Sequence, residues 1–487
     1  MALLPLMDSS LVGRANRPAL ESAGHSWTFG ELEARSNRMA RVLTGRGLGA
    51  GSRLAYYLAN RVEIIDLWIA AVKLGLVLVP VNVLYREREL KHILGDSDPA
   101  AMVASRDLAQ WIPAGVPVWD IEELAKRADA EPAGRSPVAS CGADAPIALI
   151  YTSGTTGLSK GAILTQGNFA FNGATLAREW RFTEDDRHLA FLPLFHVHGL
   201  ANSLHCWLFS GCHMRLEERF DHQRAQRWLE EYRPTVLFGV PTVFVRLVDI
   251  PEGAAREIGR RLRLAVSGSA PLAPETFQRF QDRYGTTILE RYGMTETLMN
   301  VGNPYAGERR PGTVGLPIPG VEIEIRDESG APVAPGQSGE LWVRGPNVCA
   351  GYWRRPDATQ AAWRDGWFRT GDVGVRGKDG YITLHGRRSD LIISGGFNIY
   401  PREIEELLAE QPGIREAAVV GAKDPVRGEV PVAYLVIEGK LDEEALRARL
   451  AGQLASFKLP RAFIPVESLP RTALGKIQKH ALPAWKG

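Results

Sequence analysis

The stretch Thr152 to Gly161 of this 487-residue chain combines hydroxyls, glycines and one lysine directly after the strand-like run Pro146 to Tyr151. Glycines allow backbone N–H groups to converge on phosphate oxygens, hydroxyls add donors, and a lysine offsets phosphate charge. We therefore expect a loop that wraps a polyphosphate. Its candidate contacts are Thr152, Ser153, Gly154, Thr155, Thr156, Gly157 and Lys160.

The spacing in this loop differs from the Walker A loop of motor proteins and GTPases. Walker A places a lysine directly after its second glycine and then a Ser or Thr. Here two residues separate Gly157 from Lys160, and Gly161 follows. The alternative is a surface loop without a ligand. The rarity of this composition beside a buried strand favours phosphate binding.

Five segments together resemble the signature motifs of the adenylate-forming superfamily, which includes acyl-CoA synthetases, luciferases and peptide-synthetase adenylation domains. They follow the family's order and span nearly the whole chain: Tyr151 to Gly161, Arg291 to Thr297, Trp367 to Asp372, Gly386 to Asp390 and Arg471 to Lys476. The resemblance implies an enzyme that uses ATP, Mg²⁺ and coenzyme A. A carboxylate would attack the α-phosphorus of ATP to give acyl-AMP and pyrophosphate, and a thiol would then displace AMP.

The segment Arg291 to Thr297 is expected to serve both ends of the nucleotide. Glu296 is the expected Mg²⁺ ligand and a catalytic residue, since a hard cation beside phosphate favours carboxylate oxygen. Thr295 resembles the catalytic residue that bonds the α-phosphate. Tyr292 resembles the aromatic that stacks on adenine, although an isolated Tyr-Gly pair would favour core packing. A second segment resembles the loop that lines adenine and the acyl carboxylate: Ser267, Gly268, Ser269 and Ala270.

Three further candidates come from motifs in the last part of the chain. Asp372 matches the family's ribose-binding aspartate, and Arg387 matches a second nucleotide contact near the hinge. Lys476 matches the lysine that stabilises charge during adenylation, a role suited to a mobile domain that brings the ammonium in and then rotates away. Many relatives carry Asp or Lys where Ser389 stands, so the expected hinge of this chain lacks the charged side chain at that position.

Two segments indicate which acid is activated. Pro193 to Leu200 and Glu290-Arg291, with the continuation Leu298 to Arg310, resemble the malonyl-CoA synthetases of the family. The second carboxylate of malonate needs a cationic partner if it is buried, and Arg291 offers a planar bidentate clamp. His196 and His198 would share one face of a strand. We favour His198 for contact with that carboxylate and His196 for a wall of the acyl pocket.

Several alternatives stay open. Methylmalonate is a candidate second substrate, because hydrophobic pockets discriminate one carbon weakly. If Arg291 faces solvent, the chain is instead a ligase for short- or medium-chain fatty or aromatic monocarboxylates. A non-catalytic nucleotide-binding protein is disfavoured by the presence of Lys160, Glu296, Asp372 and Lys476. CoA is favoured over a carrier protein, because no carrier segment follows Gly487.

A zinc site is a weaker alternative, and its candidate ligands are His205, Cys206, Cys212 and His213. The cysteine spacing is poor for zinc, and the intervening residues are typical of a core. We therefore expect Glu296 to be the metal-binding residue.

Composition limits the class of protein. Basic residues number 58 and acidic residues 56, so the net charge of +2 creates no strong field for nucleic acid or an anionic membrane. Four scattered cysteines favour a reducing compartment over a disulfide framework. No secretion signal is visible, and charged residues and a proline interrupt the apolar region Val62 to Tyr85. We expect a cytoplasmic protein that binds a small carboxylate.

Hydrophobic patterning predicts an α/β fold. Helical stretches at Thr28 to Arg46 and Val62 to Leu74 alternate with β-branched runs at Val77 to Val81 and Ala101 to Ala104, which is typical of βαβ units. The large N-terminal domain should therefore contain βαβ subdomains built on parallel sheets with helices on both faces.

The texture of the sequence changes from about Gly320, where short strands alternate with turn signals. This change predicts a small β-barrel-like module, followed by a smaller, mobile α+β C-terminal domain. We expect an adenylation domain at residues 1–386, which binds ATP and the acyl substrate, a hinge at 387–390, and a C-terminal domain at 391–487 that carries the catalytic lysine.

Overall fold

The structure is a computed structural model that describes residues 2–152, 159–394, 397–424, 427–451, 453–454, 456–472 and 475–485. Packing divides the chain into two compact units. Unit 1 comprises Met1–Pro311, Gly315–Ile323 and Val343–Phe368, and unit 2 comprises Gly312–Val314, Glu324–Trp342 and Arg369–Gly487.

One mixed sheet of unit 1 has parallel strands, except for the antiparallel pair β7 and β8 at its edge. Thr152 at the end of β7 faces Lys160 at the start of β8, so this hairpin encloses the predicted phosphate loop. In order across the sheet the strands are β6 (Val118–Asp120), β5 (Ala101–Ala104), β3 (Arg53–Tyr57), β4 (Val77–Pro80), β7 (Pro146–Thr152) and β8 (Lys160–Thr165).

A second sheet of unit 1 brings the ends of several parallel strands to one edge. Gly239 and Ser267 are register neighbours at the carboxyl ends of β11 and β12, and Ser267 pairs with Glu290, two positions before the end of β13. In order the strands are β15 (Leu316–Pro317), β14 (Val301–Gly302), β13 (Ile288–Tyr292), β12 (Leu264–Ser267), β11 (Val236–Gly239), β9 (Arg187–Ala190), β10 (His213–Leu216), β1 (Pro18–Ser22) and β2 (His25–Thr28).

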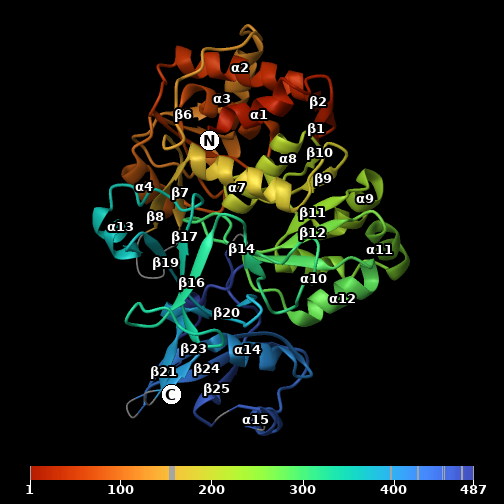
Figure 1. Ribbon diagram of the computed structural model, residues 1–487, viewed down its shortest axis with the longest axis vertical. Coiled ribbons are helices and arrows are strands. Elements are labelled where there is room, and N and C mark those ends of the chain that lie inside the picture. The colour runs from red at the N-terminus through yellow and green to blue at the C-terminus, as the bar shows by residue number, and fades with distance from the viewer. Residues whose placement is uncertain are drawn as a thin grey trace. The chain divides into compact units, whose positions relative to one another are not determined.

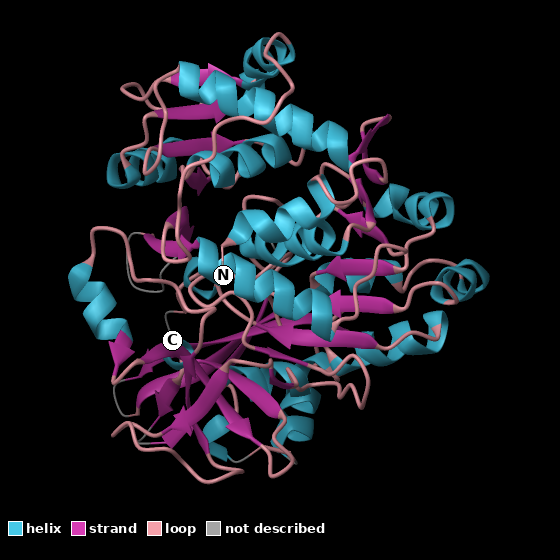
Figure 2. Ribbon diagram, turned by 45° about the horizontal axis from the view of Figure 1, so that its top comes forward, coloured by secondary structure: helices cyan, strands magenta, loops and turns pink. Residues whose placement is uncertain are grey.

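Helices of unit 1 pack beside these strands (Figures 1 and 2). The main apolar core includes Trp68, Phe169 and Trp207. The helices are α1 (Leu3–Leu11), α2 (Phe29–Gly45), α3 (Val62–Leu74), α4 (Glu87–Ser97), α5 (Arg106–Ala109), α6 (Ile121–Asp129), α7 (Gln166–Glu179), the π-helix η1 (His198–Leu204), α8 (His205–Ser210), α9 (His222–Tyr232), α10 (Pro241–Leu247), α11 (Glu252–Gly259), α12 (Pro274–Tyr284) and α13 (Pro356–Ala362).

Two further sheets follow from residue 322 onward. A third sheet has the order β16 (Glu322–Arg326), β17 (Ser338–Arg344), β19 (Trp367–Arg376) and β18 (Trp363–Arg364), with β20 (Ile382–Arg387) paired to β19. A fourth sheet has the order β22 (Phe397–Ile399), β21 (Ile392–Ser394), β24 (Gly428–Ile437) and β23 (Ile414–Asp424), with β25 (Ala462–Pro465) paired to β24. Helices here are α14 (Pro401–Ala409), α15 (Glu443–Ala451) and the 3₁₀ turns η2 (Arg388–Asp390), η3 (Ser456–Lys458) and η4 (Lys479–Ala481).

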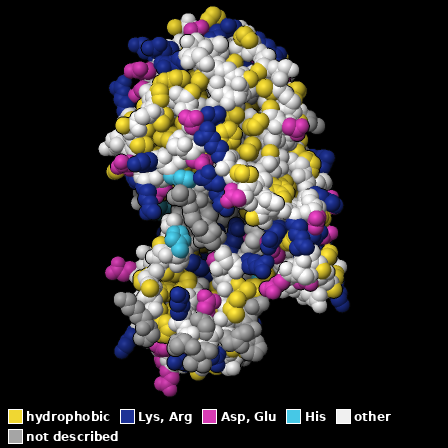
Figure 3. Space-filling model, turned by 90° about the vertical axis from the view of Figure 1, so that its left-hand side faces the viewer, with side chains coloured by type: hydrophobic (Ala, Val, Ile, Leu, Met, Phe, Trp, Pro, Cys, Tyr) yellow, Lys and Arg dark blue, Asp and Glu magenta, His cyan; other side chains and the backbone are white. Residues whose placement is uncertain are grey.

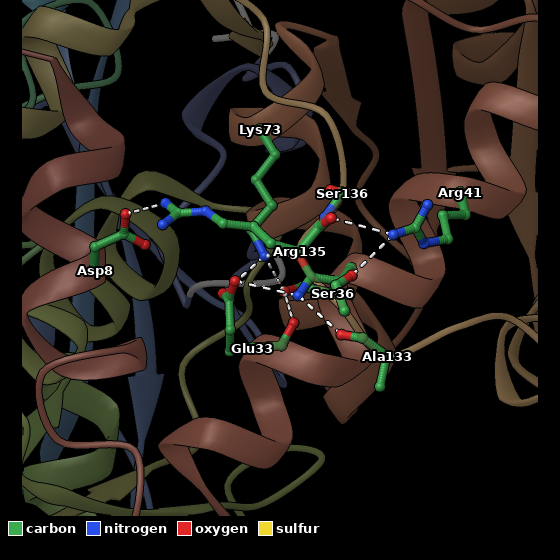
Figure 4. A network of polar contacts seen from close by, with 10 residues as sticks. Asp8, Glu33, Ser36, Arg41, Lys73, Ala133, Arg135 and Ser136 are labelled. Atoms are coloured by element: carbon green, nitrogen blue, oxygen red, sulfur yellow. Dashed lines mark hydrogen bonds and ion pairs between the residues drawn. The ribbon is translucent and has the colours of Figure 1, made fainter.

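Buried polar contacts fix the helices of the N-terminal region (Figure 4). The Lys73 side chain has no exposed area, and its Nζ donates to Glu33 Oε2 at 2.7 Å, Ser36 Oγ at 2.8 Å and Asn37 Oδ1 at 2.7 Å. Burial lowers the pKa of Lys73, and the Glu33 carboxylate opposes that effect. All three donors of the ammonium are used, so this buried lysine ties α2 to α3.

Replacing Lys73 with methionine should lower the free energy of unfolding by about 3 kcal/mol, because removing one member of a buried ion pair strands the other. Urea unfolding followed by circular dichroism measures this change. The double variant Lys73→Met/Glu33→Gln should recover part of the loss, since it removes the stranded carboxylate. An unchanged unfolding midpoint in the single variant would contradict the structural role of Lys73.

The predicted α/β class, with a larger N-terminal and a smaller C-terminal domain, is confirmed. The predicted helix at Val62 to Leu74 has those bounds, and the one at Thr28 to Arg46 spans Phe29–Gly45. Thr28 is its N-cap, because its side chain accepts from Glu31 N while the Glu31 carboxylate accepts from Thr28 N. The hinge at 387–390 and the domain limits stay predictions.

No helix within the described part of the chain has the length and apolar character needed to cross a membrane. Figure 3 shows Lys and Arg side chains interspersed with acidic and apolar ones on the face in view.

Candidate active site

The edge formed by the carboxyl ends of β11, β12 and β13 gathers the predicted acyl-binding residues. Ser267 ends β12, and Arg291 lies one position beyond Glu290, its register partner on β13. The segment from Gly268 to Ala270 follows Ser267 directly. Parallel strands end at the same edge of a sheet, and open α/β sheets bind ligands there.

Arg291 is a buried cation at this edge. Arg291 is 5% exposed, and its Nε and Nη2 have no hydrogen-bond partner among the described residues. Burial lowers the pKa of Arg291 to about 9, so the guanidinium stays charged at neutral pH. A buried cation without a counter-ion is costly. An anionic ligand would remove that cost. The low exposure of Arg291 contradicts the premise that its side chain faces solvent.

Gly268 provides the space for this guanidinium. A Cβ at Gly268 would lie 2.4 Å from Arg291 Nε and 2.6 Å from Cζ. Real Cβ atoms do not approach other heavy atoms so closely, so any side chain here would displace the guanidinium.

The variant Gly268→Ala should therefore reduce kcat/KM for the native acid about tenfold by displacing Arg291, through misplacement of a binding group. Steady-state kinetics with the acid as the varied substrate measures it. Gly253→Ala is a matched control on α11, because a Cβ there meets no heavy atom within 4 Å. Equal activities of Gly268→Ala and wild type would show that the guanidinium position is unimportant.

The strand predicted for the two histidines is wrong. His196 lies in a turn and His198 begins the π-helix η1, so the pair does not share a strand face. Every residue of η1 is buried, and apolar periodicity does not distinguish a short buried helix from a buried strand. Instead, the His198 backbone N–H donates to His196 Nδ1 at 3.2 Å.

His198 is the better placed of the two for a ligand. It is 1% exposed, its Nδ1 lies 3.1 Å from Ser269 Oγ, and its Nε2 has no partner among the described residues. Burial lowers its pKa well below the usual range, and the charges of Arg291 and His196 lower it further. Burial and Arg291 also lower the pKa of His196 to about 4. Both rings are neutral at neutral pH, so they offer hydrogen bonds and no positive charge.

Ser267 and Ser269 complete this edge. Ser267 is fully buried, and its Oγ has no partner within the part of the chain that the structure describes. Ser269 adopts a left-handed backbone conformation with φ of 72°, which is uncommon for a residue with a side chain. Such strain is found at functional sites, where surrounding contacts fix it. Ala270, beside Ser269, is partly buried.

Glu296 and Lys160, the predicted metal and phosphate ligands, meet at Tyr352. The Tyr352 hydroxyl donates to Glu296 Oε1 at 3.0 Å, and Lys160 Nζ lies 5.3 Å from the centroid of its ring. Thr152 Oγ1 lies farther from the same carboxylate oxygen, at 3.5 Å. The predicted contacts of the intervening loop, Ser153, Gly154, Thr155, Thr156 and Gly157, lie outside the described residues.

This group of oxygens suits Mg²⁺ bound together with a polyphosphate. Among the described residues, no group of three or more His, Cys, Asp or Glu side chains could hold a metal ion. Mg²⁺ usually binds through one or two carboxylates plus substrate phosphates, with no cage of protein ligands. Glu296, which is 6% exposed, fits that pattern. The zinc alternative has no such ligand group in the described chain, and burial raises the pKa of Cys212 to about 12.

Two asparagines that sequence reasoning missed hold residues 297–299, the segment directly after the loop from Tyr292 to Glu296. Asn347 Nδ2 donates to the carbonyls of Thr297 at 2.7 Å and Met299 at 2.9 Å. Asn172 Oδ1 accepts from Met299 N at 3.1 Å. Tyr292 is 9% exposed and Thr295 is partly buried. Nothing in the motifs identifies these asparagines, because their contacts are long-range.

Unit 2 brings its three predicted residues together. Asp372 and Arg387 are register partners on β19 and β20, and Arg387 Nε lies 2.8 Å from Asp372 Oδ1. Arg387 Nη1 also donates to Thr370 O at 3.0 Å. Partial desolvation lowers the pKa of Lys476, Arg387 lowers it further, and the carboxylates of Asp372 and Asp390 oppose the shift. The charges of both predicted nucleotide-binding residues, Asp372 and Arg387, therefore affect the pKa of Lys476.

Known proteins resemble this chain over nearly its full length. The model for AMP-binding enzymes matches residues 8–353, and that for their C-terminal domain matches 403–476. A sulfoacetate–CoA ligase from Cupriavidus necator is 38% identical over 472 residues, covering 94% of this chain and 92% of that protein. A feruloyl-CoA synthase from an Amycolatopsis species is 36% identical over 473 residues, covering 95% and 94%. The crystal structure of ATP-bound MatB from Rhodopseudomonas palustris has a TM-score of 0.93 and 39% identity, covering 99% of this chain and 98% of that one.

The chain therefore belongs to the AMP-binding enzymes, the adenylate-forming superfamily that its motifs predicted. Within that family it is an AMP-forming acyl-CoA ligase, which uses ATP and coenzyme A. MatB is a malonyl-CoA synthetase, and the predicted resemblance to that group is confirmed.

Proposed function

We propose that this enzyme ligates malonate to coenzyme A through malonyl-AMP, releasing AMP and pyrophosphate. The observation that supports the proposal is the buried guanidinium of Arg291, whose Nε and Nη2 lack partners among the described residues. A pocket that holds an uncompensated cation favours an acid with a second anionic group. One carboxylate then reacts while Arg291 holds the other.

Two neutral groups at the same edge add to this preference. His198 Nε2 and Ser267 Oγ are buried, and neither has a partner within the described chain. Each can donate one hydrogen bond to a carboxylate oxygen. Buried polar groups without partners are rare in folded proteins, so several at one strand edge support a small polar ligand there.

A second candidate substrate is sulfoacetate, because the ligase from Cupriavidus necator that shares 38% identity is named for it. Sulfoacetate also carries two acidic groups, and Arg291 could bind its sulfonate. Methylmalonate stays a further candidate. The monocarboxylate alternative draws support from the feruloyl-CoA synthase, but a monocarboxylate would leave the charge of Arg291 uncompensated.

In the proposed adenylation step, Arg291, His198 and Ser267 orient the acid so that one carboxylate oxygen attacks the α-phosphorus. His196 forms a wall of the acyl pocket. On the nucleotide side, Lys160, Thr152, Thr295 and the loop from Ser153 to Gly157 bind phosphates, and Tyr292, Gly268, Ser269 and Ala270 contact adenine. Positioning and charge neutralisation supply most of the catalysis in such a transfer.

Asp372 and Arg387 are proposed to bind the ribose, and Lys476 to stabilise charge on the acyl-phosphate as pyrophosphate leaves. Glu296 would hold Mg²⁺, which when bound neutralises phosphate charge. In the second step the thiol sulfur of CoA bonds to the acyl carbon, the bond to AMP breaks, and the thiol proton goes to solvent. We propose that the C-terminal domain moves about residues 387–390 between the steps.

The proposal is tested by measuring pyrophosphate release in the presence of ATP, Mg²⁺ and CoA, with one acid at a time. The acids are malonate, methylmalonate, sulfoacetate, acetate, butyrate, octanoate, benzoate and ferulate. We expect the highest kcat/KM with malonate. A clear preference for sulfoacetate would keep the two-anion pocket and change its substrate. A preference for any monocarboxylate would overturn the role of Arg291.

We also propose a cytoplasmic location. All four cysteines are free thiols: Cys141, Cys206, Cys212 and Cys349. Free thiols are typical of a reducing compartment.

A further inference from the structure

Tyr352 contacts two charged side chains that come from distant parts of unit 1. Its hydroxyl donates to Glu296 Oε1 at 3.0 Å, across 56 positions in sequence. The Lys160 ammonium lies 5.3 Å from its ring centroid, within the range of a cation–π interaction. Carboxylate and ammonium are thus held on one aromatic side chain, which no sequence motif had singled out.

The backbone around Tyr352 is fixed to the same two elements. Trp353 N donates to Gly161 O at 2.8 Å, next to Lys160, and Ala350 N donates to Ile163 O at 2.9 Å. On the other side, Cys349 N donates to Glu296 O at 2.7 Å. The segment 349–353 therefore binds β8 and the Glu296 loop at once.

Further contacts hold both the backbone and the ring of Tyr352. The backbone N–H of Tyr352 donates to Thr359 Oγ1 at 2.9 Å, and the ring packs edge-on against Trp363 with centroids 6.2 Å apart. A hydroxyl at a fixed position can restrict the orientation of a carboxylate that accepts its hydrogen bond. Groups that bond a metal ligand without touching the metal orient that ligand and tune its affinity.

We propose that Tyr352 is a positioning residue for the magnesium–ATP complex. Its hydroxyl fixes the Glu296 carboxylate for the cation, and its ring face fixes the Lys160 ammonium for the phosphates. This inference rests on the proposed roles of Glu296 and Lys160 and is independent of which acid is activated.

Two substitutions at Tyr352 distinguish the role of its hydroxyl from that of its ring. Tyr352→Phe removes the oxygen that donates to Glu296 and keeps the ring beside Lys160 and Trp363. Tyr352→Leu removes both. Thr152 lies 3.5 Å from the same carboxylate oxygen, a marginal hydrogen-bond distance, so it does not replace the hydroxyl of Tyr352.

The test measures nucleotide binding without any acid present. The thermal shift caused by saturating ATP is recorded while Mg²⁺ is titrated, and isothermal calorimetry gives the ATP affinity with and without Mg²⁺. In Tyr352→Phe the Mg²⁺ midpoint should rise about tenfold, the usual cost of losing an outer partner of a metal ligand. Its Mg²⁺-free ATP affinity should stay unchanged. In Tyr352→Leu, Mg²⁺-free ATP affinity should also fall about threefold through loss of the cation–π contact.

A double-mutant cycle asks whether the hydroxyl acts through Glu296. Glu296→Gln should raise the Mg²⁺ midpoint by itself, and adding Tyr352→Phe should then change it little, because coupled residues are not additive. Tyr284→Phe is the matched control. It removes a tyrosine hydroxyl that donates to Leu247 O at 2.8 Å on α10, and it should leave the Mg²⁺ midpoint unchanged.

Three results would overturn the proposal. The first is a wild-type Mg²⁺ midpoint in folded Tyr352→Phe, and the second is an equally large shift in the Glu296→Gln background. The third is a normal midpoint in Glu296→Gln, which would remove the metal-binding role of Glu296 and that of Tyr352 with it. Failure of malonate as substrate would appear only in the acid panel and would leave these binding results intact.

Discussion

Replacing Arg291 with methionine should stabilise the protein and nearly abolish its activity on malonate. The guanidinium is buried, and Nε and Nη2 have no partners in the described chain. Substituting an apolar side chain of similar length for a buried charge often stabilises a protein, here by about 2 kcal/mol. The thermal midpoint should therefore rise, as measured by scanning calorimetry without substrates.

The expected loss of activity has the same origin. Without Arg291 the second carboxylate of malonate would be buried with no cation. Truncating one partner of a buried charge pair costs about 4 kcal/mol, which corresponds to a drop in kcat/KM of about a thousandfold. Malonate with ATP should raise the thermal midpoint of the wild type and fail to raise that of Arg291→Met.

Arg309 supplies a matched control. This arginine is only partly buried, and its nitrogens donate to the carbonyls of Thr287 and Tyr305. Arg309→Met should destabilise the protein through these lost hydrogen bonds and leave the order of acid preference unchanged. The prediction for Arg291 fails if Arg291→Met lowers the thermal midpoint and keeps malonate activity, because the guanidinium would then be a structural group.

Local signals predicted the helices well. The Thr28 and Glu31 capping pair marks the start of α2, and Gly75 in a left-handed conformation, with φ of 68°, ends α3 at Leu74. The strands expected from about Gly320 onward include the observed β16 (Glu322–Arg326) and β17 (Ser338–Arg344). In each case the pattern is contained in a few neighbouring residues.

The histidine pair shows where local patterning fails. A spacing of two beside apolar residues favoured a strand, yet His198 begins a π-helix. All residues of that helix are buried, so no polar face revealed its period. Tertiary packing, which a single sequence does not encode locally, decided the conformation.

One part of the candidate site could be placed from the sequence because its residues are contiguous. Arg291, Tyr292, Thr295 and Glu296 occupy one short segment, so their shared location follows from the chain itself. Tyr352 was missed because its contact with Glu296 joins residues 56 positions apart. The lack of partners for Arg291 Nε and Nη2 among the described residues is likewise a property of the folded protein. This lack of partners supports an anionic ligand at Arg291, which the motif by itself did not require.

Replacing Lys476 with alanine should slow the adenylation half-reaction about a thousandfold, the upper range for losing one group that stabilises transition-state charge. Thioester formation from supplied malonyl-AMP should be far less affected, because no phosphoryl transfer occurs there. Pyrophosphate release reports the first step, and CoA-dependent loss of malonyl-AMP reports the second. Equal losses in both steps would point to a general defect in folding or domain movement.

The pH dependence of the same step provides an independent test. Partial desolvation and the charge of Arg387 lower the pKa of Lys476 below its ordinary value of 10.5, while Asp372 and Asp390 oppose the shift. The reaction needs the protonated form, so the adenylation rate should fall as the pH rises through this lowered pKa, before an ordinary lysine would lose its proton. Lys476→Arg should be slower at neutral pH, because a planar guanidinium replaces a compact ammonium, but its alkaline decline should disappear. If the decline persists in Lys476→Arg, another group titrates, and the charge of Lys476 does not limit the step.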